Sequence, residues 1–264
     1  MEDNLYKISN FLKSQLYPLT VNAISYCGGK FRVRKPIGAY LNKIRKEGQS
    51  YYEPFVGGGW ILSQIKDGPN YASDANEYLI AMWKAVQKGW EPPAKISEAQ
   101  YAKAQKQIKE NDGKGKMSKE LLAFIGFGCS FAGKWYGGYA RDGEDNNFAI
   151  KAKNSLKRKI ESFNKKTTFK CMSYEDLKPD KNSLIYCDPP YDDTTQGYLH
   201  TDFDSEKFWE WVRKMTKAGH TVLVSEYKAP KDFKCVLSVK TTTGLSTKDG
   251  KESRFERLYQ YKGR

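Results

Sequence analysis

Residues 183–191 read SLIYCDPPY, and this stretch decides the fold of the chain. Small and apolar residues followed by an acidic turn predict a short strand that is buried on both faces, as in a parallel sheet. Asp188, Pro189, Pro190 and Tyr191 then lie at the carboxyl edge, where open α/β sheets bind ligands. The prolines stiffen the turn and lack N–H groups, so a carboxylate, a rigid carbonyl and a ring come together. Such a set can hold a planar base, and an ordinary turn is the alternative.

Strands alternate with helices on both sides of this stretch. Further strands are predicted at 50–56, 70–73, 167–174, 221–227, 235–240 and 257–261, and helices at 36–48, 60–66, from 76 onward and at 205–215. This alternation predicts a layered α/β fold with a mixed, mostly parallel sheet between helices. The rhythm stops between residues 91 and 165, which are rich in Lys, Gln, Asn and Gly. We therefore expect residues 1–90 and 166–264 to form one domain that carries 91–165 as an inserted, mainly helical subdomain.

The chain is strongly basic. Its 264 residues include 45 Lys and Arg against 31 Asp and Glu, which gives a net charge of +14 and a pI near 9.3. Lys and Arg placed along phosphates release condensed counterions, so this excess predicts a polyanionic partner. The charge alone leaves ribosomal proteins, membrane-surface proteins and nucleic-acid enzymes as alternatives.

Several other classes of protein are not expected. No stretch approaches the roughly 18 to 20 apolar residues that span a bilayer, and the start MEDN does not resemble a secretory signal. The cysteines are scattered without a CxxC pair, and His200 and His220 are the only histidines. This argues against a disulfide scaffold and against a metal site. We expect a cytoplasmic protein with no metal and no membrane contact.

A glycine motif, EPFVGGG at 53–59, follows the strand predicted at 50–56. Glycines between a strand and a helix permit a tight turn and let a ligand approach the backbone. The motif is neither the GxGxxG dinucleotide fingerprint nor a phosphate loop ending in GKS or GKT. Asp74 follows the next strand, where an acidic residue accepts hydrogen bonds from ribose hydroxyls in nucleotide-type folds. The alternatives are a plain turn for the glycines and a helix cap beside Asn76 for Asp74.

Six motifs, taken together, resemble the Dam-type DNA adenine-N6 methyltransferases, and they occur in the order of that family. They are YCGGK at 26–30, EPFVGGG at 53–59, SDANEYLIAMW from 73, KCMSYED at 170–176, YCDPPYD at 186–192 and VLVSEY at 222–227. The resemblance covers nearly the whole chain outside 94–165. It implies S-adenosyl-L-methionine as the methyl donor and a Rossmann-like S-adenosylmethionine-dependent methyltransferase fold, with residues 91–165 as the target-recognition subdomain.

The resemblance also implies roles for individual residues. Tyr26 and Lys30 would border the cofactor, Phe55, Gly57 and Gly59 would line its methionine end, Asp74 would bind the ribose hydroxyls, and Ser173 and Tyr174 would flank its adenine. Asp188 would lie between the cofactor and the target amine, with Pro189 and Pro190 forming the turn and Tyr191 stacking on the base.

The chemistry of these residues agrees with the resemblance. The lone pair of an adenine amino group is delocalised into the ring, so the group is a poor nucleophile. The Asp188 carboxylate and the Pro189 carbonyl could both accept its N–H groups and localise that lone pair. A stacked base cannot reach such a site, so the target must be flipped out of the duplex. Residues 196–203 could form a lid over that base or an ordinary surface connection.

Residues 130–170 carry the pattern expected for contact with double-stranded DNA. The candidates are Lys134, Tyr136 and Arg141 in an aromatic and glycine-rich stretch, and Lys157, Arg158 and Lys159 in a lysine-rich one. A solvated basic face is the alternative for the lysines, and a small core of the inserted segment is the alternative for the aromatics. The Arg/Asn-rich recognition hairpin of the family, with its FNxP stretch, is absent from the sequence, so a GATC target is implied only by analogy.

Two other functions compete with this one. The same fold could act on cytosine N4 or on adenine in RNA, although an Asp in place of a Ser before Pro-Pro-Tyr favours adenine in this family. The chain could also be a catalytically inactive DNA-binding relative. The presence of Asp74, Asp188, Tyr191 and the glycines argues against such decay.

Overall fold

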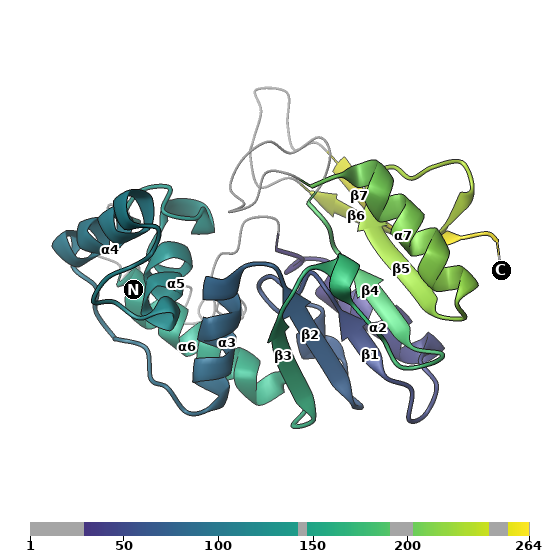
Figure 1. The fold of residues 1–264 in the computed structure, drawn as a ribbon, viewed down its shortest axis with the longest axis horizontal. Coiled ribbons are helices and arrows are strands. Elements are labelled where there is room, and N and C mark those ends of the chain that lie inside the picture. The colour runs from purple at the N-terminus through teal and green to yellow at the C-terminus, as the bar shows by residue number, and fades with distance from the viewer. Residues whose placement is uncertain (1–28, 142–146, 191–202, 243–252, 264) are drawn as a thin grey trace, which may run out of the picture.

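The computed structural model describes residues 29–141, 147–190, 203–242 and 253–263. Within these residues it contains a seven-stranded sheet in the order β3-β2-β1-β4-β5-β7-β6 (Figure 1). The strands are β1 Tyr51–Glu53, β2 Asn70–Asp74, β3 Thr167–Cys171, β4 Leu184–Cys187, β5 Thr221–Glu226, β6 Phe233–Thr242 and β7 Ser253–Tyr261. Strands β1 to β5 pair in parallel, and β7 runs antiparallel to both β5 and β6.

Helices lie along both faces and at one side of this sheet. The α-helices are α2 Arg34–Ile44, α3 Glu77–Gln87, α4 Glu98–Asn111, α5 Lys119–Gly128, α6 Phe148–Ser162 and α7 Ser205–Lys217. Short 3-10 turns are η1 Leu62–Gln64, η2 Phe131–Gly133 and η3 Tyr174–Asp176. The mixed, mostly parallel sheet between helices confirms the predicted Rossmann-like methyltransferase fold.

The helix predicted at residues 60–66 is wrong. The structure has only the single turn η1 there. Gly59, which precedes this segment, has a φ of 67°, and β2 already begins at Asn70. Too few residues remain for a helix of two or more turns that returns along the sheet.

Alternate residues of β4 pack against opposite layers. Leu184 and Tyr186 belong to the hydrophobic cluster that contains Leu41 of α2 and Trp83 of α3. Ile185 and Cys187 belong to a second cluster, which contains residues of α7 such as Phe208, Trp211 and Val212. All residues of β4 are buried, as the sequence SLIYC predicted. The sheet is therefore the middle of three layers.

The strand order diverges at β1 and β4. β1 pairs with β2 on one side and with β4 on the other, in a register that places Tyr51 beside Leu184 and Tyr52 beside Ile185. The segments that follow both strands therefore leave the sheet side by side at its carboxyl edge. In open α/β sheets this point of divergence is where ligands bind.

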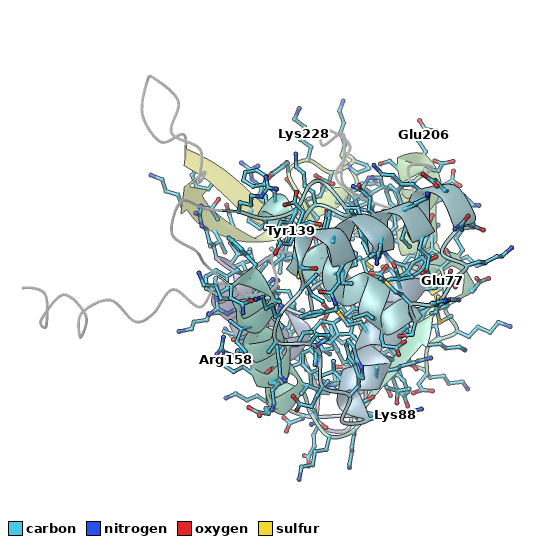
Figure 2. The ribbon with its side chains drawn as sticks, turned by 90° about the vertical axis from the view of Figure 1, so that its left-hand side faces the viewer. Glu77, Lys88, Tyr139, Arg158, Glu206 and Lys228 are labelled. Atoms are coloured by element: carbon cyan, nitrogen blue, oxygen red, sulfur yellow. The ribbon has the colours of Figure 1, made fainter. Side chains whose placement is uncertain are left out.

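The inserted helices share the core of the sheet. Phe124 of α5 and Leu156 of α6 belong to the same cluster as Tyr51 of β1 and Trp83 of α3. Figure 1 shows α4, α5 and α6 grouped beside α3, and Figure 2 views the molecule from that side. The division of the chain into a catalytic domain and an inserted subdomain stays a prediction, because one cluster runs through both.

Phe124→Ala should destabilise the whole chain and not the inserted helices alone. The ring is completely buried, so its removal is expected to cost about 3–5 kcal/mol of unfolding free energy. Urea unfolding followed by circular dichroism and by tryptophan fluorescence should still give coincident transitions. Phe131→Ala is the matched control, since that ring is 62% exposed and its removal should change stability by less than about 0.5 kcal/mol. A separate early transition in Phe124→Ala would show that the inserted helices unfold independently.

Candidate active site

The glycine loop, residues 55–60, follows β1 and is fixed by the neighbouring strand. The Val56 N–H donates to the Ser73 carbonyl at 2.9 Å, and the Gly57 N–H donates to Asp74 Oδ2 at 3.0 Å. Gly57 and Gly59 have φ values of 45° and 67°, in the left-handed region that favours glycine. The loop thus turns sharply against the end of β2.

Side chains from two helices hold the carbonyl groups of the same loop. The Trp83 indole N–H of α3 donates to the Gly57 carbonyl at 3.0 Å. The Lys159 amine of α6 donates to the Gly58 carbonyl at 2.5 Å. A Cβ at Gly59 would lie 2.8 Å from Cζ of Phe163, the residue that follows α6. Side chains of α3, of α6 and of the residue after α6 therefore hold the backbone of the loop in its path.

Asp74 connects this loop to the start of α3. One carboxylate oxygen accepts from Gly57 N–H, and the other accepts from Asn76 N–H at 3.0 Å. Asn76 itself caps the helix, because its side chain accepts from Leu79 N–H at 3.0 Å. The interpretation of Asp74 as the helix cap is therefore wrong. Its half-buried carboxylate lies at the carboxyl end of β2, where the predicted ribose contact requires it.

Asp188 forms an ion pair at the end of β4. Its Oδ1 lies 2.7 Å from Lys30 Nζ, and Glu256 Oε1 of β7 lies 3.6 Å from the same nitrogen. Burial alone would lower the pKa of Lys30, but the negative charges of Asp188 and Glu256 outweigh it and raise that pKa above the ordinary value. Lys30 is therefore a cation that holds the Asp188 carboxylate in place. Pro189 behind it is buried.

Burial shifts the pKa values of other ionisable groups under the site. Glu53 is buried at the end of β1 and accepts from the Tyr51 hydroxyl at 2.7 Å. Burial, together with the charge of Asp188, raises the pKa of Glu53 well above its usual range. Burial likewise raises the pKa of the Cys187 thiol, so this cysteine remains protonated and cannot serve as a nucleophile. Asp188 thus has Lys30 as its ion-pair partner, with the carboxylate of Glu256 on the same nitrogen.

Aromatic rings line the α7 side of the glycine loop. Phe55 stacks on Tyr174 with the ring centroids 5.4 Å apart, and both rings contact Phe208 of α7. Burial raises the pKa of Tyr174 to about 12, so its hydroxyl stays neutral. Ser173 accepts from Glu175 N–H at 3.3 Å and begins η3. The structure therefore brings Phe55 and Tyr174 together, as expected if both face the same ligand.

Part of the predicted site lies outside the described residues. Tyr26, Tyr191 and residues 196–202 of the predicted lid belong to that part. Phe203, the last residue of that loop, is described and contacts Phe55 and Tyr174.

Four of the six predicted DNA contacts are surface residues. Lys134 and Arg158 are exposed, and Arg158 projects outward from α6 (Figure 2). Arg141 is exposed and ion-paired with Glu98. Lys157 is exposed and lies 2.9 Å from Glu91.

The structure corrects the other two DNA contacts. Tyr136 is buried, and its hydroxyl donates to the Leu122 carbonyl at 2.9 Å, so it belongs to the core of the inserted helices. Lys159 is 5% exposed and points to the glycine loop. Neither side chain can reach a phosphate on the surface.

Sequence reasoning missed the role of Glu256 because β7 lies far from the other motifs along the chain. A local signal existed, however. In the stretch 255–258, FERL, the alternation of a strand places Glu256 on the same face as Leu258, which is buried. A charged residue on a buried face needs a partner, and Lys30 is that partner.

Membrane spans and metal clusters are both missing from the described residues. None of their helices is long and apolar enough to cross a membrane. Nor do their His, Cys, Asp and Glu side chains gather in a group of three or more that could hold a metal ion.

Comparisons with known proteins agree with this geometry. The chain matches the family described as D12 class N6 adenine-specific DNA methyltransferase over residues 26–115 and 135–254. DNA adenine methylase of Salmonella typhi is 24% identical over 228 residues, which are 77% of this chain and 74% of that protein. The Vibrio cholerae O395 DNA adenine methylase is 26% identical over 190 residues, or 64% of either chain.

In two further comparisons, this chain covers a smaller share of the matched protein. DNA N-6-adenine-methyltransferase of Escherichia phage P1 is 23% identical over 226 residues, which are 78% of this chain and 29% of that protein. The solved structure of SMU.472, a proposed methyltransferase complexed with SAH, covers 88% of this chain at 14% identity with a TM-score of 0.36. The chain spans 52% of that structure.

Gly59→Ala should destabilise the protein more than Gly48→Ala does. The two glycines have nearly equal φ values of 67° and 68°, so each substitution carries a backbone cost of about 1 kcal/mol. An added Cβ meets nothing within 4 Å at Gly48, whereas at Gly59 it meets a Phe163 ring packed against Trp83. We expect about 1–3 kcal/mol of extra loss in unfolding free energy at Gly59, measured in urea. Equal losses would mean that the loop is not confined by that ring.

Proposed function

The chain belongs to the D12 class N6 adenine-specific DNA methyltransferase family, and we propose that it transfers the methyl group of S-adenosylmethionine to the N6 amino group of an adenine flipped out of double-stranded DNA. One observation carries the proposal: the glycine loop after β1 and the Asp188 turn after β4 leave adjacent parallel strands at the point where the strand order diverges. A methyl donor bound at the glycine loop would therefore lie next to a base bound at the Asp188 turn.

The residues present fit the methyl donor. The glycine loop keeps positive φ angles and lacks side chains at 57–59, so a ligand can approach its backbone. Asp74 lies one strand away with a half-buried carboxylate suited to two ribose hydroxyls. Phe55 and Tyr174 stack on each other at 5.4 Å, which suits rings that line neighbouring parts of one ligand, Phe55 the methionine end and Tyr174 the adenine. When bound, S-adenosylmethionine supplies an electrophilic methyl group on a positively charged sulfur.

Asp188 and Pro189 would prepare the attacking nitrogen. The Lys30 ammonium keeps the Asp188 side chain an ionised acceptor and fixes its orientation. The Pro189 carbonyl belongs to a stiff turn with no N–H of its own to compete for it. Two acceptors on one amino group draw its hydrogens aside and localise its lone pair toward the methyl group. Orientation and electrostatic preorganisation of this kind typically contribute several kcal/mol each.

Base flipping follows from where Asp188 lies. Its side chain is 19% exposed at the edge of the sheet, and an amino group stacked inside a duplex cannot reach it. The base must therefore leave the helix, which costs a few kcal/mol. Exposed cations such as Lys134 and Arg158 would hold the phosphates meanwhile. With DNA as substrate, we expect the enzyme to act in the cytoplasm of a bacterial or phage-infected cell.

The direct test is analysis of nucleosides from DNA methylated by the purified protein. Duplex DNA without modified bases is incubated with S-adenosylmethionine, digested and examined by mass spectrometry. N6-methyladenine is the expected product. N4-methylcytosine, or methylation of RNA and not of DNA, would contradict the proposed acceptor, and sequencing of the modified strands would define the recognition site.

Asp188→Ala should reduce methyl transfer by about 100- to 1,000-fold, because one of the two acceptors on the amino group is removed. Most of the DNA affinity should remain, whereas the melting temperature should fall because the buried Lys30 loses its 2.7 Å partner. Cys187→Ala is the matched control: its thiol is buried and protonated, so turnover should stay within a few-fold of the wild-type rate. Both rates are measured with labelled methyl donor on a duplex. Near-normal turnover in Asp188→Ala would refute the catalytic assignment.

Replacing Lys157 and Arg158 together by Met should make DNA binding less sensitive to salt. If each side chain neutralises one phosphate, its removal should reduce the slope of log K against log salt concentration by about 0.9. The control is Lys84 and Lys88 replaced by Met, which removes the same charge from exposed positions near the far end of α3. If both pairs change the slope equally, the two α6 residues do not contact phosphate.

A further inference from the structure

Lys159 is a buried amine that the proposed chemistry does not use. It lies on α6, in the inserted segment, and its Nζ donates to the carbonyl of Gly58. The same nitrogen lies 3.4 Å from the centroid of the Trp60 ring, on the far side of the glycine loop. One side chain of the inserted segment therefore binds the middle of the loop and packs on the residue that ends it.

Nothing near Lys159 explains its burial as an ordinary ion pair. Among the described residues, no carboxylate lies within ion-pairing distance of its Nζ. Burial, with the charge of Arg34 in addition, lowers the pKa of Lys159 well below the usual value. An apolar side chain of similar length would avoid this desolvation cost. The hydrogen bond to Gly58 is the interaction that only the amine can make.

Other side chains reinforce the hydrogen bond between Lys159 and the Gly58 carbonyl. Trp60 also receives Phe31 edge-on at 4.9 Å, and the Arg34 guanidinium lies 5.6 Å from the Trp60 ring centroid. On the neighbouring carbonyl, Gly57, the Trp83 indole forms the second bond. Two consecutive peptide carbonyls of the loop are thus held by side chains of α3 and α6, while the Gly59 N–H donates to the Val56 carbonyl at 2.8 Å within the loop.

We propose that Lys159 is a positioning residue through which helix α6 of the inserted segment holds the glycine loop in the shape that receives the methyl donor. The inference rests on the proposed function for the identity of that ligand. It gives the inserted segment a part in the cofactor site in addition to any contact with DNA. It also separates two adjacent residues by role: Arg158 faces outward, whereas Lys159 faces the loop.

K159M is the test variant, because methionine fills a similar volume and cannot donate a hydrogen bond. Affinity for S-adenosylmethionine is measured by calorimetry, and backbone exchange of residues 55–62 is measured by hydrogen–deuterium mass spectrometry on the protein alone. We expect exchange in the loop to accelerate and the affinity to fall about tenfold, the size expected when one buried hydrogen bond is removed. The KM for the methyl donor should rise while the KM for DNA stays constant.

R158M is the matched control, since it removes one charge from the next position of the same helix. It should leave loop exchange and methyl-donor affinity unchanged. K159Q distinguishes positioning from packing: glutamine packs less well than methionine but keeps an N–H donor. If Lys159 positions the loop, K159Q should bind the methyl donor more tightly than K159M does.

The outcomes separate this inference from the proposed function. Three outcomes would overturn the positioning role. They are unchanged loop exchange in K159M, tighter binding of S-adenosylmethionine by K159M than by K159Q, and failure of K159M to fold. Absence of methyl-donor binding in the wild type would refute the proposed function instead. The exchange measurement would then still decide whether Lys159 holds the loop, because it needs no ligand.

Discussion

The parallel pairing of β1 with β4 is the constraint on which the rest of the structure depends. The pairing joins only Tyr51 to Leu184 and Tyr52 to Ile185, yet it brings together two segments that are more than a hundred residues apart in sequence. A shift by one residue would exchange the faces of Ile185 and Tyr186, whose side chains pack in different layers. The complete burial of β4 therefore fixes where Asp188 leaves the sheet relative to the glycine loop that follows β1.

The site is rich in acidic side chains, whereas the chain as a whole is basic. The protein carries a net charge of +14, but Glu53 and Asp74 end β1 and β2, Asp188 follows β4, and Glu256 of β7 lies near Lys30. Burial raises the pKa of Glu53 well above its usual range, and Lys30 lies 2.7 Å from Asp188 and 3.6 Å from Glu256. The excess of cations lies elsewhere, on exposed helix surfaces such as that of Arg158.

The sequence predicted those features that local signals define. Strands ending in glycine, Asp74 or Asp188 are short buried runs followed by turns, and each was found close to its expected range. The prediction of a helix at 60–66 is wrong because hydrophobic spacing does not show how few residues separate this segment from the start of β2 at Asn70. Lys159 was misjudged because it was read as one of a run of lysines. The spacing Ala149, Ala152, Leu156 and Lys159 places it on the apolar face of α6, and this periodicity was the better signal. For Glu256, the alternation of FERL indicates a buried face, but only the fold shows that its partner is Lys30.

An inserted segment that contributes to the glycine loop is constrained in how it can vary. Its outer surface can change with the DNA sequence to be recognised, since exposed residues such as Lys134 and Arg158 contact few other parts of the protein. The inner face of α6 cannot, because Lys159 and the adjacent Phe163 determine the path of Gly58 and Gly59. The two faces of α6 would therefore serve different parts of the proposed function, the outer face contact with DNA and the inner face the shape of the glycine loop. What the loop takes from this helix is a buried anchor, the Lys159 amine on the Gly58 carbonyl, and such an anchor does not depend on which residues the outer face carries.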